Sequence, residues 1–181
     1  AIDSQPWLTA AETGVQRRTQ QYGWTYSYHS AGNYSEKGIN GEESNFIGTL
    51  PDWLGNLVER ATEAGLAKEP FNQVSVNEYV DGRGIGQHTD TTEGFKGPVA
   101  SLSLLSPVVL TFRDSAKHEV PVLLPHRSFL CLDGESRTEW SHGIKSKNRA
   151  RKVDVFDGRE YTRQRRIAIT FRQVDMSNFQ T

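Results

Sequence analysis

The chain has little that would place it outside the cell or in a membrane. It has a single cysteine, Cys131, so no internal disulfide can form, and this fits a reducing compartment. No apolar run approaches the ~20 residues that a membrane helix needs, and the first residues lack the basic-then-apolar layout of a secretory signal. We therefore expect an intracellular protein with no membrane partner.

The length of the chain suggests one domain, and its charge is unevenly distributed along the sequence. Its 181 residues suffice for a sizeable core, and we expect a single domain over 1–181 that acts as a monomer. Residues 145–166 hold nine Lys/Arg against three Asp/Glu, a net +6, which leaves −7 for the remainder of a chain whose net charge is −1. A polyanion binder and a solvated surface loop both explain this pattern.

Hydrophobic periodicity predicts one helix followed by a β-rich region. The helix is expected over 51–65, because Pro51 suits a first turn, Trp53 and Leu57 lie on an apolar stripe, and Gly65 suits a C-terminus. Short strands separated by turn residues are predicted at 73–80, 99–105, 108–112, 120–125, 128–132 and 165–174. This pattern favours an α+β, mainly β domain built as a sandwich, barrel or jelly roll.

Two predicted strands carry a polar face. Residues alternate between faces along a strand. The polar face of strand 73–80 holds Ser75, Asn77 and Tyr79, and that of strand 165–174 holds Arg166, Ala168, Thr170 and Arg172. Contact with water would explain either face alone. Both strands, however, flank a group of histidines that offers another explanation.

The stretch GIGQHTDTTEG places His88 and Asp90 two positions apart, so both side chains project from the same side of a strand. Such a pair supplies two of the three ligands of a facial iron site, and His142 in ESRTEWSHGI can supply the third. Two imidazoles and one carboxylate leave three coordination positions open for a 2-oxo acid and dioxygen. The remaining histidines are expected to be structural or surface residues: His29, His118 and His126.

The order of these motifs resembles the AlkB family of iron(II) and 2-oxoglutarate dioxygenases. A His-x-Asp pair alone is common, whereas several motifs in a fixed order are specific. In chain order they are Asn77-x-Tyr79, His88-x-Asp90, GESR at 134–137, His142, and Arg166 and Arg172 separated by five residues. The resemblance extends over about residues 15–174, and within the family it is nearest to a tRNA-modifying branch.

The resemblance implies a fold, a cofactor and a set of ligands. The expected fold is a double-stranded β-helix, or jelly roll, over 73–174, with a flanking N-terminal helix and a nucleotide-recognition lid within the extension 1–50. The expected cofactor is Fe(II), with 2-oxoglutarate and O2 as cosubstrates. The implied metal-binding and catalytic residues are His88, Asp90 and His142. The implied cosubstrate contacts are Asn77, Tyr79, Arg166, Thr170 and Arg172.

Substrate contacts are implied less directly. Trp24 and Tyr26 match the lid of the family and are expected to meet a flipped base, with core packing as the alternative. Thr92 stands near the base, where repair members of the family carry an acidic residue. Arg137 is expected to support the metal ligands from behind. Nearby cations, among them Arg17 and the adjoining Arg18, are expected to meet phosphate.

Three functions follow from this resemblance. The expected one is oxidative demethylation of N-methylated bases, foremost N3-methylcytosine in tRNA, other RNA or single-stranded DNA. The alternative is hydroxylation of a modified wobble uridine in tRNA. The third, a catalytically silent nucleic-acid-binding module, is disfavoured because the metal and arginine motifs are intact. Nucleic acid is the expected partner in all three.

Overall fold

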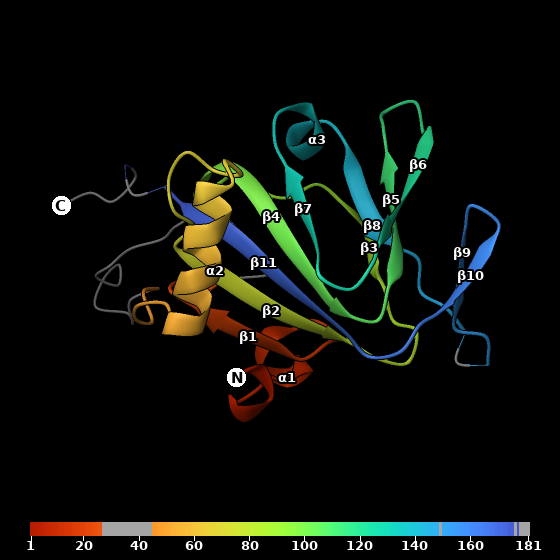
Figure 1. The fold of residues 1–181 in the computed structure, drawn as a ribbon, viewed down its shortest axis with the longest axis horizontal. Helices are drawn as coiled ribbons and strands as arrows, with labels where there is room; N and C mark the ends of the chain where they lie inside the picture. Colours follow the sequence, from red (N-terminus) through yellow and green to blue (C-terminus); the bar gives the residue numbers. More distant parts are fainter. Residues whose placement is uncertain (27–44, 149, 176, 178–181) are drawn as a thin grey trace.

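The computed structural model describes residues 1–26, 45–148, 150–175 and 177, and within that part of the chain two antiparallel sheets face each other (Figure 1). The larger sheet joins, in spatial order, β1 (Thr19–Tyr22), β2 (Gln73–Tyr79), β11 (Arg166–Val174), β4 (Phe95–Leu105) and β7 (Ser128–Leu132). The smaller sheet joins β3 (Ile85–His88), β8 (Ser141–Ile144), β5 (Val108–Arg113) and β6 (Glu119–Leu124). The predicted mainly β jelly roll is confirmed.

Short connections determine which strands oppose each other across the sandwich. Residues 80–84 lead from β2 to β3, residues 106–107 from β4 to β5, and residues 125–127 from β6 to β7. Because such short segments cannot cross a sheet, β2 lies opposite β3, β4 opposite β5 and β7 opposite β6, which leaves β11 opposite β8. One edge of the sandwich is therefore formed by β1 and β3.

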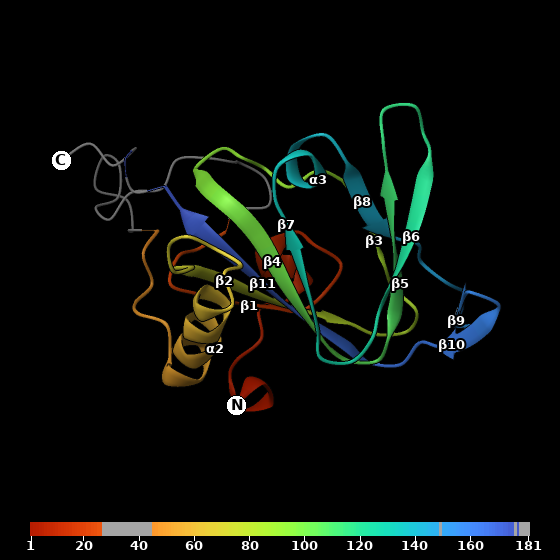
Figure 2. The same ribbon diagram turned by 45° about the horizontal axis from the view of Figure 1, so that its top comes forward.

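Helix α2 (Asp52–Glu63) covers the outer face of the larger sheet (Figures 1 and 2). The buried residues that join this helix to the last strand are Leu54, Val58, Ala61, Ile167, Ile169 and Phe171. Since these residues of β11 point toward α2, the alternate residues from Arg166 to Arg172 point between the sheets. The polar face predicted from the sequence is therefore not a water-facing surface.

The predicted helix is confirmed with small shifts at its ends. Pro51 precedes the first helical residue as its N-cap, and the helix stops just before Gly65, which has φ of +72°. This left-handed conformation favours glycine after a helix. The other described helices are a turn or so long: η1 (Ile2–Ser4), α1 (Ala10–Thr13) and α3 (Glu135–Thr138). Among the described residues, no helix is long and apolar enough to cross a membrane.

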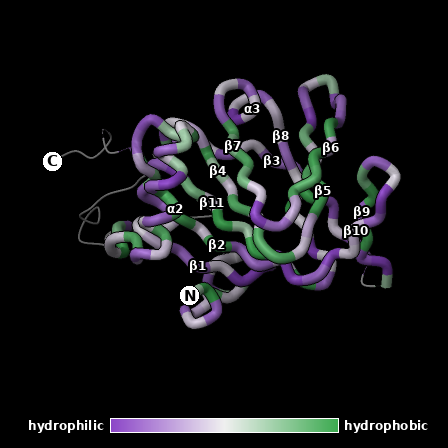
Figure 3. Tube along the Cα trace, viewed as in Figure 1, coloured by the Kyte–Doolittle hydropathy of each residue, from purple (hydrophilic) through white to green (hydrophobic). Residues whose placement is uncertain are grey.

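A second apolar cluster lies between the two sheets. Its buried members are Val108, Leu110, Leu124 and Ile144. Figure 3 shows hydrophobic stretches along β5 and β7, on either side of this space. These side chains fill the space between the sheets near β5 and β6. The polar side chains between the sheets lie nearer to β2, β3, β8 and β11.

The short strands predicted between residues 73 and 174 all occur, with ends that differ by a few residues. Short strands were missed: β1, β8, β9 (Val153–Phe156) and β10 (Arg159–Thr162); the strand expected to carry His88 and Asp90 ends at His88, so Asp90 lies just beyond it. Strands β9 and β10 pair as a separate hairpin at the end of the molecule away from α2 (Figures 1 and 2). Residues 27–44 of the predicted lid lie outside the described residues, as does His29.

Several cations of the basic segment 145–166 form ion pairs within the described part of the chain. Its cations that pair with carboxylates are Lys147, Arg151, Lys152, Arg163 and Arg165. The strongest case is Arg163, whose Nε and Nη2 lie 2.6 and 2.7 Å from the buried carboxylate of Asp154. The charge asymmetry of the sequence is only partly offset by these pairs, because Asp154 and Glu160 are already counted in the net +6 and only Asp3, Glu78 and Asp81 lie outside the segment. It does not by itself identify a nucleic-acid surface.

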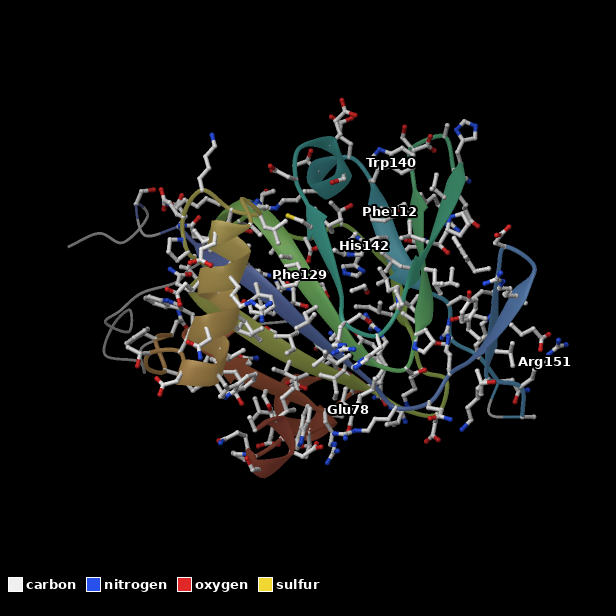
Figure 4. All side chains as sticks on the ribbon, in the orientation of Figure 1. Glu78, Phe112, Phe129, Trp140, His142 and Arg151 are labelled. Carbon is white, nitrogen blue, oxygen red and sulfur yellow. The ribbon has the colours of Figure 1, made fainter. Side chains whose placement is uncertain are left out.

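A carboxylate on the outer face of β2 ties the N-terminal segment to the larger sheet (Figure 4). Glu78 is buried, and its Oε2 and Oε1 accept hydrogen bonds of 2.6 and 2.9 Å from Nε and Nη2 of Arg18. Nε of Arg165 donates to the same carboxylate over 2.8 Å, and Arg165 also pairs with Asp3. These hydrogen bonds, Arg18 foremost, lower the pKa of Glu78.

We expect Glu78→Gln to lower the free energy of unfolding by about 2 kcal/mol at neutral pH, because charge-assisted hydrogen bonds are lost. The folded pKa of Glu78 is lowered, so its contribution is present above the ordinary glutamate pKa and is lost as the pH falls through the folded value. Urea denaturation at several pH values would measure this. The control, Glu119→Gln, removes an exposed pair and should cost about 0.5 kcal/mol or less. Equal effects of the two changes would contradict the assignment.

Candidate metal and cosubstrate site

Two neighbouring strands of the smaller sheet bring the predicted metal ligands together. His88 ends β3 and pairs with His142 of β8, while Asp90 follows two residues after His88. One ligand atom from each of the three side chains lies within 4.8 Å of the others. Figure 4 shows His142 between the two sheets. The geometry therefore allows the two imidazoles and the carboxylate to hold one metal ion.

Glycines allow β3 and β8 to approach closely enough for this pairing. A Cβ added at Gly84 would lie 1.8 Å from the backbone oxygen of Ile144, and one at Gly143 would lie 3.0 Å from the nitrogen of Gln87. Larger residues would push the strands apart. The same glycines make both strands difficult to recognise from hydrophobic patterning, because glycine is depleted in strands.

Both imidazoles are prepared to offer a lone pair. Nδ1 of His88 lies 2.9 Å from the carbonyl oxygen of Gly86, so it carries the proton, and Nε2 is left as the acceptor. Nε2 of His142 lies 3.6 Å from Asp90 Oδ2. Burial lowers the pKa of His142 to about 4; His88 and Arg172 act in the same direction, and Asp90 opposes them. His142 is therefore neutral at physiological pH, as a metal ligand must be.

The opposite wall of the site is the polar face of β2 and β11. The strand register places Arg166 opposite Tyr79 and Ala168 opposite Asn77. All five predicted cosubstrate residues line a cavity of about 180 Å³ together with His88, Asp90 and His142. The small side chain of Ala168 leaves room between the arginines at the two ends of this strand. A molecule that fills this cavity would extend from the metal ligands to Arg166.

Arg166 is a buried cation at the far end of the cavity. It is 5% exposed, its Nε donates to Ser103 Oγ over 3.0 Å, and its guanidinium lies 5.3 Å from the centre of the Tyr79 ring. Among the residues that the structure describes, no carboxylate pairs with it. Burial lowers its pKa accordingly. An uncompensated buried charge is costly, so this position is suited to an anionic ligand.

Arg172 occupies the metal end of the same strand face. Its Nη2 lies 3.6 Å from Asp90 Oδ1, and its guanidinium lies 4.5 Å from the centre of the Tyr26 ring. Within the described chain, Nε of Arg172 is buried without a hydrogen-bond partner. This donor and the charge of Arg166 fit a ligand with a carboxylate at each end, as 2-oxoglutarate has.

The three predicted substrate residues lie in different environments. Trp24 is 2% exposed and packs with Phe95 and Val174, so its ring cannot stack on a base, and its prediction as a substrate contact is corrected to core packing. Tyr26 lines the cavity over Arg172. Thr92 is exposed in the loop after Asp90 and does not line the cavity.

Arg137 lies where the sequence placed it, behind the metal ligands. It is buried, and its Nη2 donates to the backbone oxygen of Thr91 over 3.4 Å. Burial lowers its pKa, while the charge of Asp90 partly offsets this effect. It therefore adds positive charge beside Asp90.

The predicted phosphate-binding pair Arg17 and Arg18 is divided between two faces of the sheet. Arg18 pairs with Glu78 on the outer face, whereas Arg17 lines the cavity and donates from Nε to Asn77 Oδ1 over 2.8 Å. This position of Arg17 was not predicted from the sequence. The two residues precede β1, so only their contacts in the fold, with Asn77 and with Glu78, show which one faces inward.

The other described histidines lie away from the cavity, as expected. His118 pairs with Asp114 in the turn between β5 and β6, with 2.9 Å between Nδ1 and Oδ2. Nδ1 of His126 accepts a hydrogen bond of 2.8 Å from the backbone nitrogen of Leu105. Both are structural or surface contacts.

Comparisons with known proteins agree with this geometry. A family model described as the 2OG-Fe(II) oxygenase superfamily matches residues 5–172. The tRNA (carboxymethyluridine(34)-5-O)-methyltransferase alkbh8 of Xenopus tropicalis is 32% identical over 155 residues, which are 86% of this chain and 23% of the relative. A DNA N6-methyl adenine demethylase of Caenorhabditis elegans is 27% identical over 178 residues, 95% of this chain and 53% of the relative. The chain thus spans less than a quarter of the first relative and about half of the second.

A solved structure, that of OsALKBH1, shares the fold with a TM-score of 0.59 and 21% identity, covering 88% of this chain and 79% of that one. The chain therefore belongs to the 2OG-Fe(II) oxygenase superfamily, and within it to the AlkB family. As a member it is a dioxygenase that uses Fe(II), 2-oxoglutarate and O2.

We expect His88→Ala and Asp90→Ala to abolish near-stoichiometric Fe(II) binding, because each removes one of the three grouped ligands. Anaerobic equilibrium dialysis with metal analysis would measure the loss. His118→Ala is the matched control, since this histidine lies in the β5–β6 turn. Retention of iron by both ligand variants would show that the metal binds elsewhere.

Proposed function

We propose that the protein oxidises a modified base of tRNA, with iron held by His88, Asp90 and His142. Arg166 and Tyr79 would bind the distal carboxylate of 2-oxoglutarate, and Arg172, Asn77 and Thr170 would line the part nearer the metal. The buried charge of Arg166 in the same cavity as the metal ligands carries the assignment of the cosubstrate site, and the tRNA-modifying relative supports tRNA as the substrate.

The residues of the chain have distinct tasks in such a reaction. Bound Fe(II) would supply O2 activation and couple the decarboxylation of 2-oxoglutarate to hydroxylation of a C–H bond. Arg166 would fix the direction of the dicarboxylate, and the neutral His142 would keep its lone pair available. The apolar cluster between the sheets limits water on the far side. The protein thus contributes orientation, charge and exclusion of water.

The charge of the cavity bears on the choice of base. Of the described residues that line it, Asp90 is the only acidic one, whereas Arg17, Arg166 and Arg172 are cationic. With Fe(II) and the dianionic 2-oxoglutarate bound, positive charge remains in excess. N3-methylcytosine carries a positive charge at neutral pH, and Thr92 supplies no acidic group to balance it.

This charge balance favours hydroxylation of a modified wobble uridine over demethylation of N3-methylcytosine, which the sequence analysis placed first. A uridine is neutral, and an acidic substituent would match the cavity. The Xenopus relative is named for a carboxymethyluridine at position 34 of tRNA. Demethylation of an uncharged N-methylated base in RNA or single-stranded DNA is the second candidate, supported by the name of the Caenorhabditis relative.

Nucleoside mass spectrometry of total tRNA treated with the protein, Fe(II), 2-oxoglutarate and O2 would test the proposal. We expect one oxygen atom to be added to a wobble uridine that keeps its substituent. The control is the Asp90→Ala variant under the same conditions. Loss of N3-methylcytidine with release of formaldehyde would instead establish the demethylase. No change in any tRNA nucleoside would contradict tRNA as the substrate.

We expect Arg166→Met to raise the KM for 2-oxoglutarate by about 30-fold or more, since loss of one partner from a buried charge pair costs about 2–5 kcal/mol. Steady-state assays of succinate formation at varied 2-oxoglutarate would measure the change. Arg113→Met is the control, because this arginine pairs with Glu119 on a surface hairpin. An unchanged KM in Arg166→Met would remove Arg166 from the cosubstrate site.

A further inference from the structure

Arg17 reaches the cavity from a segment that none of the family motifs covers. Thr19 of β1 is paired with Asn77 of β2, and the backbone nitrogen of Glu78 donates to the oxygen of Arg18 over 3.0 Å. Arg17 and Arg18 directly precede β1, and their side chains take different directions: Arg18 pairs with Glu78 on the outer face, whereas Arg17 lines the cavity.

Inside the cavity, Arg17 contacts two of the proposed cosubstrate residues. Its Nε donates to Asn77 Oδ1 over 2.8 Å, and its guanidinium lies 5.8 Å from the centre of the Tyr79 ring. Asn77 is 6% exposed and lies opposite the small residue Ala168, at the middle of the cavity wall. The hydrogen bond therefore acts on a side chain that faces the space a dicarboxylate would occupy.

An asparagine amide has an accepting oxygen and a donating NH2 group at nearly the same distance from the backbone. The carboxylates and the keto oxygen of 2-oxoglutarate only accept hydrogen bonds. Asn77 can therefore assist binding only when its NH2 group is turned toward the cosubstrate. The hydrogen bond from Arg17 Nε to Asn77 Oδ1 favours this orientation. If the amide were flipped, its NH2 group would face the N–H of Arg17, and two donors would oppose each other.

We propose that Arg17 is a positioning residue for the cosubstrate, which holds the Asn77 amide with its NH2 group toward 2-oxoglutarate. This inference rests on the proposed function of the cavity. It assigns the effect to the N–H donor at Nε and not to the charge of the guanidinium. The two contributions can be separated, because different substitutions keep one and remove the other.

Three replacements of Arg17 separate the effect of its Nε hydrogen-bond donor from the effect of its positive charge. In Arg17→Gln, the amide nitrogen stands at the same place along the side chain as Nε, so the donor is kept and the charge is lost. In Arg17→Lys, a methylene stands there, so the charge is kept and the donor is displaced. Arg17→Met removes both. Arg159→Met is the matched control, because Arg159 is an exposed residue of β10 that does not line the cavity.

The first readout is binding of 2-oxoglutarate to the Mn(II)-loaded protein, measured by calorimetry without turnover. We expect Arg17→Met and Arg17→Lys to weaken binding about tenfold, the effect of one hydrogen bond, while Arg17→Gln and Arg159→Met stay within about twofold of the original protein. In turnover assays the same pattern should appear in the KM for 2-oxoglutarate, with kcat little changed. Wild-type affinity in Arg17→Met, or loss in Arg17→Gln with retention in Arg17→Lys, would overturn the proposal.

A double-mutant cycle with Asn77→Ala tests whether the effect passes through Asn77. Once the amide is absent, Arg17→Met should weaken binding no further. Additive losses would show that Arg17 acts independently of Asn77 and would overturn the proposal. If all Arg17 variants bound 2-oxoglutarate normally while Arg166→Met did not, only this inference would fail. If the original protein did not bind 2-oxoglutarate at all, the proposed function would fail with it.

Discussion

Burying the guanidinium of Arg166 between two sheets carries a free-energy cost that an anion in the same cavity can offset. The packing around Arg166 keeps its guanidinium buried and facing the cavity. The apolar face of β11 packs on α2, which turns Arg166 inward, and Ser103 holds its Nε. The small Ala168 beside it leaves space toward the metal ligands. One strand thus links the hydrophobic core to the site.

The other wall of the cavity meets a different physical requirement. The smaller sheet has to bring two imidazoles and a carboxylate within reach of one ion while keeping His142 neutral. Close approach of β3 and β8 at their glycines supplies the geometry, and burial of His142 supplies the low pKa. A sandwich of two sheets suits this task, because each sheet carries one half of the site and the core fixes the distance between them.

Local patterns in the sequence predicted those parts of the site that depend on strand alternation and motif order. His88, Asp90, His142 and the face from Arg166 to Arg172 all fall where the sequence analysis placed them. Trp24 does not, because its burial depends on Phe95 and Val174, which are far away in the sequence. An aromatic ring suits a core and a base-stacking lid equally well, so its residue type could not decide between them.

Long-range pairing explains the other differences. The sequence left the basic segment as either a polyanion binder or a solvated loop, and its pairing with the distant carboxylates Glu78 and Asp81 appears only in the fold. Likewise, the inward position of Arg17 appears only in its contact with Asn77, which lies 60 residues further along the chain. Charge counted along a sequence does not reveal which charges are neutralised in the fold.

The most direct test of the account is a crystal structure of the protein with Mn(II) and 2-oxoglutarate. The account predicts one metal ion bound by His88, Asp90 and His142, and a dicarboxylate that extends from it to the guanidinium of Arg166. A metal ion bound elsewhere, or a cosubstrate whose distal carboxylate lies away from Arg166, would contradict it.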